Sequence, residues 1–257
     1  MNTTPFNNYT ISPKDAFTIV DLQKTFAENQ ENEKPGALVV WDTKNLAAPT
    51  NRAVANFKSQ SWRVLASLEQ HALWHISFAS SFIWKKSITE VWPEDPRAFI
   101  THEEVKNWTP ENNWLSQTAE FTLRELQAYM EIRGTEAMWP DHATPWYESE
   151  FITWFDDTQV DRVFIKWDDI DEHTYSAFAA KDADGVLLAD YMREREVERN
   201  FVSSLATDFC VKNTAIDSVK EWFKTYFLKS LSRSVYPENE PAVLEELQDN
   251  WVTIITD

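Results

Sequence analysis

The chain has 257 residues, of which 43% are hydrophobic and 14% aromatic, and its formal net charge is −18. This composition is that of a packed globular protein with one large or two small domains, and it excludes a disordered chain. The negative charge disfavours direct binding to duplex nucleic acid or to an anionic membrane surface, because both are themselves negatively charged.

Glycine, cysteine and apolar segments exclude further classes. The three glycines, at positions 36, 134 and 185, lie too far apart to form the glycine-rich loops that hold nucleotide phosphates. The single cysteine, Cys210, can form neither an internal disulfide nor a cysteine zinc cluster, which favours a reducing compartment such as the cytoplasm. No cofactor is predicted. The first residues lack a secretory signal pattern, and no segment resembles a membrane span.

The first half of the chain contains several predicted elements. A serine, a proline and an acidic residue at 12, 13 and 15 predict the start of a helix that runs to about residue 27. A short strand is expected over 37–41. From 61 to 92 apolar and polar residues alternate, which predicts three strands of an antiparallel meander. A capping-box pattern predicts a central helix over 122–134.

The second half begins after a proline-containing linker at 138–147. Apolar runs at 151–155 and 163–167, with a turn at 181–185, predict a second antiparallel sheet that is strongly acidic. Further expected elements are helices over 190–208, 217–231 and 240–249, and a terminal strand over 251–255.

These elements predict an α+β fold. We expect antiparallel sheets with helices packed on one face, and a core rich in tryptophan because the chain has 13 of these residues. The predicted segments are 1–137, with the first helix, the meander and the central helix, and 146–257, with the acidic sheet and the C-terminal helices. The two segments could also form one domain.

The sequence contains three candidate metal motifs, and none of them predicts a metal site. His71 and His75 are four residues apart, but on a strand that spacing separates them by about 13 Å. The acidic run from Asp168 to His173 has oxygen ligands suited to Mg²⁺, yet it is more typical of a solvated turn. The segment 182–185 lacks the later ligands of a calcium loop and is also predicted to be a turn.

No catalytic residue is predicted either. Cys210 lies among apolar residues with no histidine nearby in the sequence, which is typical of a buried, inert thiol. Lys166 is expected on a strand, where nucleases can carry a Glu-x-Lys motif. The two residues before Lys166 are apolar, so the motif is not present.

The acidic segment from Glu148 to Asp190 therefore dominates the functional prediction. It contains twelve acidic residues against three basic ones. We predict a non-catalytic interaction factor whose acidic face docks on a basic protein, such as an inhibitor or accessory subunit of a nucleic-acid-processing complex. The predicted partner-binding residues are Asp156, Asp157, Asp168, Asp169, Asp171 and Glu172.

The alternative is an enzyme that acts on a cationic or neutral small molecule. Its pocket would be formed by aromatic residues next to the acids, namely Trp146, Tyr147, Trp154 and Trp167.

Overall fold

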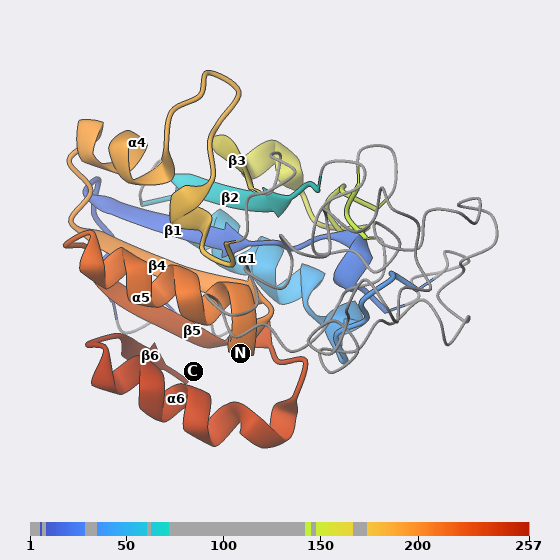
Figure 1. Ribbon diagram of the computed structural model, residues 1–257. Helices are drawn as coiled ribbons and strands as arrows, with labels where there is room; N and C mark the ends of the chain where they lie inside the picture. The colour runs from blue at the N-terminus through green and yellow to red at the C-terminus, as the bar shows by residue number, and fades with distance from the viewer. Residues whose placement is uncertain are drawn as a thin grey trace, which may run out of the picture.

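A six-stranded, fully parallel sheet forms the centre of the protein, in the order β3-β2-β1-β4-β5-β6 (Figure 1). The computed structural model describes residues 6, 9–28, 35–60, 63–71, 142–144, 148–166 and 174–256. The strands are β1 Asp15–Val20, β2 Val64–Glu69, β3 Arg162–Lys166, β4 Arg199–Leu205, β5 Lys224–Arg233 and β6 Thr253–Ile255.

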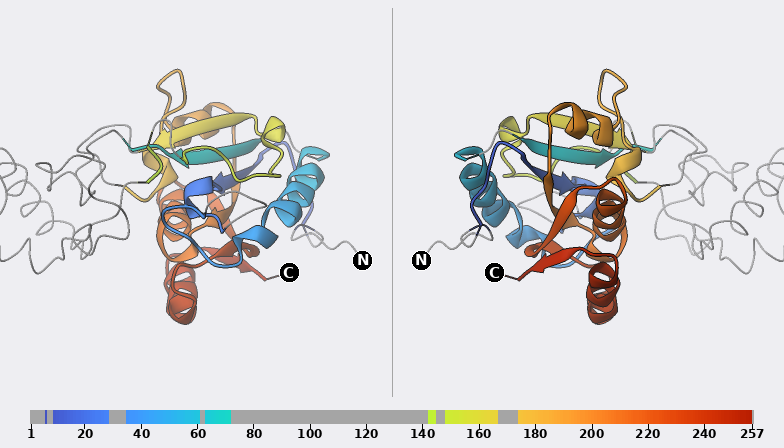
Figure 2. Two further views of the ribbon diagram at one scale, coloured as in Figure 1. Left: turned by 90° about the vertical axis from the view of Figure 1, so that its right-hand side faces the viewer. Right: turned by 90° about the vertical axis from the view of Figure 1, so that its left-hand side faces the viewer.

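Helices cover both faces of this sheet. The α-helices are α1 Ala47–Lys58, α4 Leu188–Glu194, α5 Lys212–Lys220 and α6 Glu240–Asp249. Short 3₁₀ helices are η1 Lys24–Phe26, η2 Thr43–Asn45, η7 Asp157–Gln159, η8 Ala177–Ala179 and η10 Pro237–Asn239, and η9 Thr207–Val211 is a π-helix. The helix α1 lies on one face, whereas α5 and α6 lie on the other (Figure 2).

The alternation of side chains along β1 explains the two cores. Phe17 and Ile19 belong to the hydrophobic cluster on the α1 side, where Phe57 is also buried. Val20 belongs to the cluster that contains side chains of α5 and α6, such as Leu247. Because both faces of the strand are covered, all six residues of β1 are buried, as expected for a central strand of a parallel sheet.

The prediction of an α+β fold with antiparallel sheets and helices on one face is therefore wrong. A short apolar run can form a fully buried parallel strand or a strand of an antiparallel sheet. The local pattern therefore could not give the relative direction of the strands. The expected tryptophan-rich core is also absent from the described part of the chain. All four of its tryptophans, Trp41, Trp154, Trp222 and Trp251, are exposed, and phenylalanines fill the core instead.

Several predicted helices are strands. The segment 12–27 contains β1, and the carboxylate of Asp15, expected in the first turn of a helix, accepts hydrogen bonds from the Arg199 guanidinium. The helix predicted over 217–231 ends at Lys220, and β5 begins at Lys224. Between them Trp222 has a left-handed φ of 72°, which terminates α5. The helix predicted over 190–208 likewise gives way to β4, and 37–41 contains turns.

Other predictions are confirmed. The helix over 240–249 is α6, and the terminal strand joins the sheet beside β5 as β6. The turn at 181–185 is closed by the carboxylate of Asp182, which accepts the amide N–H groups of Asp184 and Val186. The first strand of the predicted meander is present as β2, but it pairs in parallel with β1 and β3, so the antiparallel pairing predicted for it is wrong. The other two predicted strands and the central helix lie outside the described residues.

Both predicted segments contribute to the single sheet, the first with β1 and β2 and the second with β3 to β6. Among the described helices, none has both the length and the apolar character needed to span a membrane.

Candidate active site

Four reactive side chains lie at the carboxyl ends of four neighbouring strands. Asp21 directly follows β1, Glu69 ends β2, Lys166 ends β3, and Cys210 lies on η9 just after β4. Parallel strands bring their carboxyl ends to one edge of the sheet. The strand order changes direction between β1 and β4, and ligands of such sheets bind in the crevice at this point. All four side chains are buried.

The ammonium group of Lys166 is the centre of this cluster. Its Nζ atom lies 2.8 Å from Asp21 Oδ2 and donates a hydrogen bond to Cys210 Sγ at 3.1 Å. A second carboxylate oxygen, Glu69 Oε1, lies 3.8 Å away. The other oxygen of Asp21 accepts a hydrogen bond from the Ser67 hydroxyl at 2.8 Å. Lysine, thiol and carboxylate are thus held within contact distance inside the protein.

Burial and mutual charge set the protonation of these groups. Burial opposes the charge of Lys166, but Asp21, Cys210 and Glu69 outweigh it and raise the lysine pKa. Burial raises the pKa of Asp21, and the attraction of Lys166 offsets this only in part. Burial also raises the pKa of the Cys210 thiol well above its usual value. The resting cluster therefore has a charged lysine, a protonated thiol and a carboxylate with increased proton affinity.

Cys210 also lies near the amino end of a continuous helical segment. The π-helix η9 runs directly into α5, so the thiol lies in the first turns of the combined helix. The positive end of the helix dipole favours negative charge at this position. Single π-helical turns are frequent at functional sites.

Beside the lysine, Glu69, His71 and His142 form a candidate metal centre. One ligand atom from each lies within 4.8 Å of the others. His71 Nε2 lies 3.3 Å from Glu69 Oε1, and His142 Nε2 lies 3.6 Å from Glu69 Oε2. Lys166 and the two histidines outweigh the effect of burial and hold the pKa of Glu69 well below its usual range.

The chemistry of this donor set fits a divalent cation such as Zn²⁺. Two imidazole nitrogens and one carboxylate are typical of catalytic zinc sites, which keep a further position for water or substrate. Glu69 Oε2 is buried and accepts no hydrogen bond within the described part of the chain. The side-chain amide of Gln23 makes two hydrogen bonds with the Glu69 backbone. It donates to the Glu69 carbonyl oxygen at 2.8 Å and accepts the Glu69 N–H at 2.7 Å. Such supporting contacts orient metal ligands.

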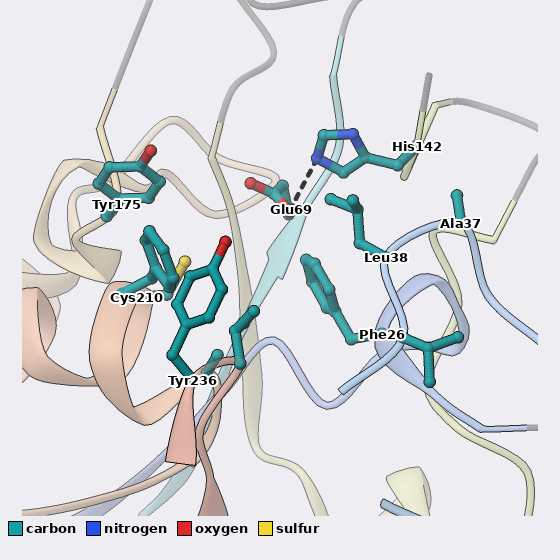
Figure 3. Close-up of a pocket in the computed structure, with 12 residues that line it drawn as sticks. Phe26, Ala37, Leu38, Glu69, His142, Tyr175, Cys210 and Tyr236 are labelled. Carbon is teal, nitrogen blue, oxygen red and sulfur yellow. Dashed lines mark ion pairs between the residues drawn. The ribbon is translucent and has the colours of Figure 1, made fainter. Parts of the chain in front are cut away.

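Cys210 and two of the candidate metal ligands line a cavity of about 300 Å³. Its polar lining includes Glu69, His142 and Cys210, and its apolar lining includes Phe26, Leu38, Tyr175, Phe209 and Tyr236. Phe26 and Leu38 lie on one side, and Tyr175 and Tyr236 lie with Cys210 on the other (Figure 3). A small, mostly apolar molecule with a polar group that reaches Glu69, His142 or Cys210 matches this volume and lining.

Gly36 allows the loop that carries Leu38 to pack against η1. Its amide donates to the Ala27 carbonyl, and the Leu38 amide donates to Thr25. A Cβ atom at Gly36 would lie 2.2 Å from the Thr25 carbonyl oxygen, which is too close for two atoms that are not bonded.

We expect Gly36→Ala to displace the side of the cavity that Phe26 and Leu38 line, and to destabilise the protein by about 1–3 kcal/mol. Chemical denaturation and the KM for substrate measure this; an unchanged KM would contradict the role of the loop in forming the cavity.

The residues predicted from the sequence do not form this site. Asp156 and Asp157 are exposed and do not line the cavity, and Asp168, Asp169, Asp171 and Glu172 lie outside the described residues. Of the alternative aromatic pocket, Trp154 is described and is 52% exposed; Trp146, Tyr147 and Trp167 are outside the described part.

Two residues for which the sequence predicts no functional role belong to the site. The spacing of His71 and His75 predicts no metal site, but the structure places His71 beside Glu69 and His142. The sequence around Cys210 predicts an inert thiol because no histidine is nearby, but the structure places the Lys166 ammonium group beside it. The available signal was that Asp21, Glu69 and Lys166 each end or follow an apolar run.

No protein-family model matches the chain. The chain is similar to the nicotinamidase/pyrazinamidase of Mycobacterium tuberculosis, with 32% identity over 120 residues, which is 46% of this chain and 62% of that protein. It is 25% identical over 249 residues to the nicotinamidase of Escherichia coli, covering 95% of each chain. The chain thus spans less than two thirds of the first relative and nearly all of the second.

The fold agrees with solved structures. The pyrazinamidase of Pyrococcus horikoshii in complex with zinc superposes with a TM-score of 0.63 and 23% identity, over 95% of this chain and 100% of that one. The parallel sheet with helices on both faces matches the isochorismatase-like α/β fold. These findings contradict the prediction of a non-catalytic acidic factor, because the relatives are hydrolases. They favour the alternative interpretation, an enzyme acting on a small molecule.

Proposed function

We propose that this protein is a cysteine-dependent amidohydrolase that converts a small aromatic carboxamide, such as nicotinamide, into the carboxylic acid and ammonia. The observation that carries the proposal is the contact of Lys166 Nζ with both Asp21 Oδ2 at 2.8 Å and Cys210 Sγ at 3.1 Å. A nucleophile that lines a cavity, with an acid–base group and a fixed positive charge beside it, has the parts that acyl transfer requires.

In the first half of the reaction, Cys210 Sγ forms a bond to the carboxamide carbon. The thiol proton passes to the Asp21 carboxylate, whose pKa is raised by burial, so that it is a better base than an exposed aspartate. The carbonyl electron pair moves to oxygen and then returns as the C–N bond breaks. The proton held by Asp21 leaves with the nitrogen, so ammonia departs and a thioester to Cys210 remains.

In the second half, water attacks the thioester carbon while Asp21 accepts one of its protons. The carboxylic acid is released as the C–S bond breaks, and the proton returns to sulfur. Lys166 keeps its charge throughout, because its neighbours raise its pKa. It therefore orients Asp21 and stabilises the sulfur anion whenever the proton is absent.

Glu69, His71 and His142 would hold a divalent metal ion next to this cluster. When bound, such an ion supplies a Lewis acid that orients substrate or activates water. The covalent chemistry is performed by Cys210 with Asp21 and Lys166, and the apolar side chains that line the cavity exclude bulk water.

The choice of substrate rests on the cavity and on the relatives. Aromatic and aliphatic side chains such as Phe26 and Leu38 line a cavity whose volume suits one small ring, and the Cys210 thiol belongs to the same lining. The similar proteins of M. tuberculosis and E. coli are named as a nicotinamidase/pyrazinamidase and a nicotinamidase. Nicotinamide, with a planar six-membered ring and one carboxamide, fits these observations.

The test measures ammonia and nicotinate released from nicotinamide by the purified protein, with Zn²⁺ added and with a chelator. We expect turnover of nicotinamide and pyrazinamide, and much less of glutamine, whose flexible polar chain does not match the aromatic walls. Alkylation of Cys210 by iodoacetamide, followed by mass spectrometry, reports independently that the thiol is accessible. An alkylated thiol combined with no ammonia release from any aromatic carboxamide would overturn the proposal.

A further inference from the structure

We infer that Tyr236 is a specificity-determining residue that packs against the substrate ring, and that Asp208 positions it. This inference rests on the proposed function and adds a residue that lies on the loop after β5 rather than in the reactive cluster. Tyr236 is 45% exposed, although large aromatic side chains favour burial. It nevertheless lines the cavity, with its hydroxyl directed into it from the side on which Cys210 lies (Figure 3).

Two hydrogen bonds fix the backbone of this loop. The Asp208 carboxylate accepts the amide N–H of Val235 at 3.0 Å and that of Tyr236 at 2.8 Å. Bonds from a charged acceptor are stronger than neutral ones. Asp208 precedes Cys210 by two residues on η9, so the turn that carries the nucleophile also holds the loop that carries Tyr236. The position of the aromatic ring is thereby coupled to that of the thiol.

Further aromatic rings lie beside Tyr236 on the same side of the cavity. Phe209 lies between its two partners, with ring centroids 5.6 Å from Tyr175 and 6.2 Å from Tyr236. Phe26 lies on the opposite side of the cavity (Figure 3). A planar ring bound between these walls would contact Tyr236 over its face or edge, and such aromatic contacts add to the energy of simple burial. Tyr236 should therefore favour aromatic over aliphatic carboxamides.

The test separates binding from turnover. Binding of nicotinamide is measured by calorimetry in Cys210→Ala, which cannot turn the substrate over, and in the same background with Tyr236→Ala, Tyr236→Phe or Asp208→Ala. Each protein has Zn²⁺ added and is checked by thermal unfolding. We expect Tyr236→Ala to weaken binding by roughly tenfold to a hundredfold, and Tyr236→Phe by less than about threefold, because it keeps the ring. Asp208→Ala should fall between them.

The matched control is Trp222→Ala. Trp222 is a 92% exposed aromatic residue between α5 and the amino end of β5, at the opposite end of the strands from the cavity, and its replacement should leave binding unchanged. Kinetics in the Cys210-containing protein should show the Tyr236→Ala effect mainly in KM, and relatively more for nicotinamide than for an aliphatic amide.

Each combination of results has one meaning. Turnover by the unmodified protein with unchanged binding in Tyr236→Ala overturns the inference and leaves the proposed function intact. Binding that depends on Tyr236 without any turnover supports the inference and overturns the proposed function. Absence of both overturns both, and an unchanged affinity in Asp208→Ala alone removes the positioning role of that residue.

Discussion

Replacing Cys210 by alanine is expected to lower carboxamide hydrolysis by at least about 10⁴-fold, because removal of a nucleophile leaves only binding and electrostatic effects. Structural damage should be small. The thiol is buried, but it is a small group, so its removal leaves a small void. Ammonia release measures the activity, and rapid quenching followed by mass spectrometry should detect an acyl adduct in the unmodified protein and none in the variant.

Cys210→Ser is the matched comparison for this prediction. It keeps a hydroxyl beside Lys166 but has a far poorer nucleophile, so it should be nearly as inactive as the alanine variant. Both variants should retain the thermal unfolding of the parent protein to within a few degrees. Activity that survives in either variant would rule out a thioester pathway through this residue.

Lys166→Met should abolish activity and destabilise the protein by about 3–5 kcal/mol. The side chain is fully buried and lies between the carboxylates of Asp21 and Glu69. Methionine has a similar volume but no charge, so the two buried carboxylates would lose the positive charge that lies between them. Chemical denaturation measures the loss of stability. Adding Asp21→Asn should recover part of the stability, because one buried charge is removed, without recovering activity.

Lys212→Met is the control for the energetic argument. Lys212 forms an ion pair with Glu246 at 2.8 Å, in which the lysine and glutamate side chains are 20% and 47% exposed. Ion pairs open to solvent contribute at most about 1 kcal/mol, so the effect should be several-fold smaller than at Lys166. A Lys166→Met protein as stable as this control, or one that remains active, would contradict the assigned role of the buried lysine.

Much of the local structure could be predicted from the sequence, but the direction of the strands could not. The helix α6 and the terminal strand β6 have local signals, an apolar helical stripe and a short apolar run. The segment 217–231 shows the limit of such signals. Its apolar residues fit a helical stripe, yet a left-handed Trp222 ends α5 and the remaining residues form β5, which is covered on both sides.

By itself, the sequence determined the class of a packed globular chain, the absence of glycine-rich phosphate loops and the C-terminal helix and strand, because these depend on composition and on neighbouring residues. Only the tertiary structure decided the site. Asp21, Glu69, Lys166 and Cys210 are spread over 190 positions of the chain, and no local pattern relates one to another. They meet because the four neighbouring strands β3, β2, β1 and β4 are parallel, which brings their carboxyl ends to one edge of the sheet. Burial and mutual charge at this edge produce the reactivity of the four side chains.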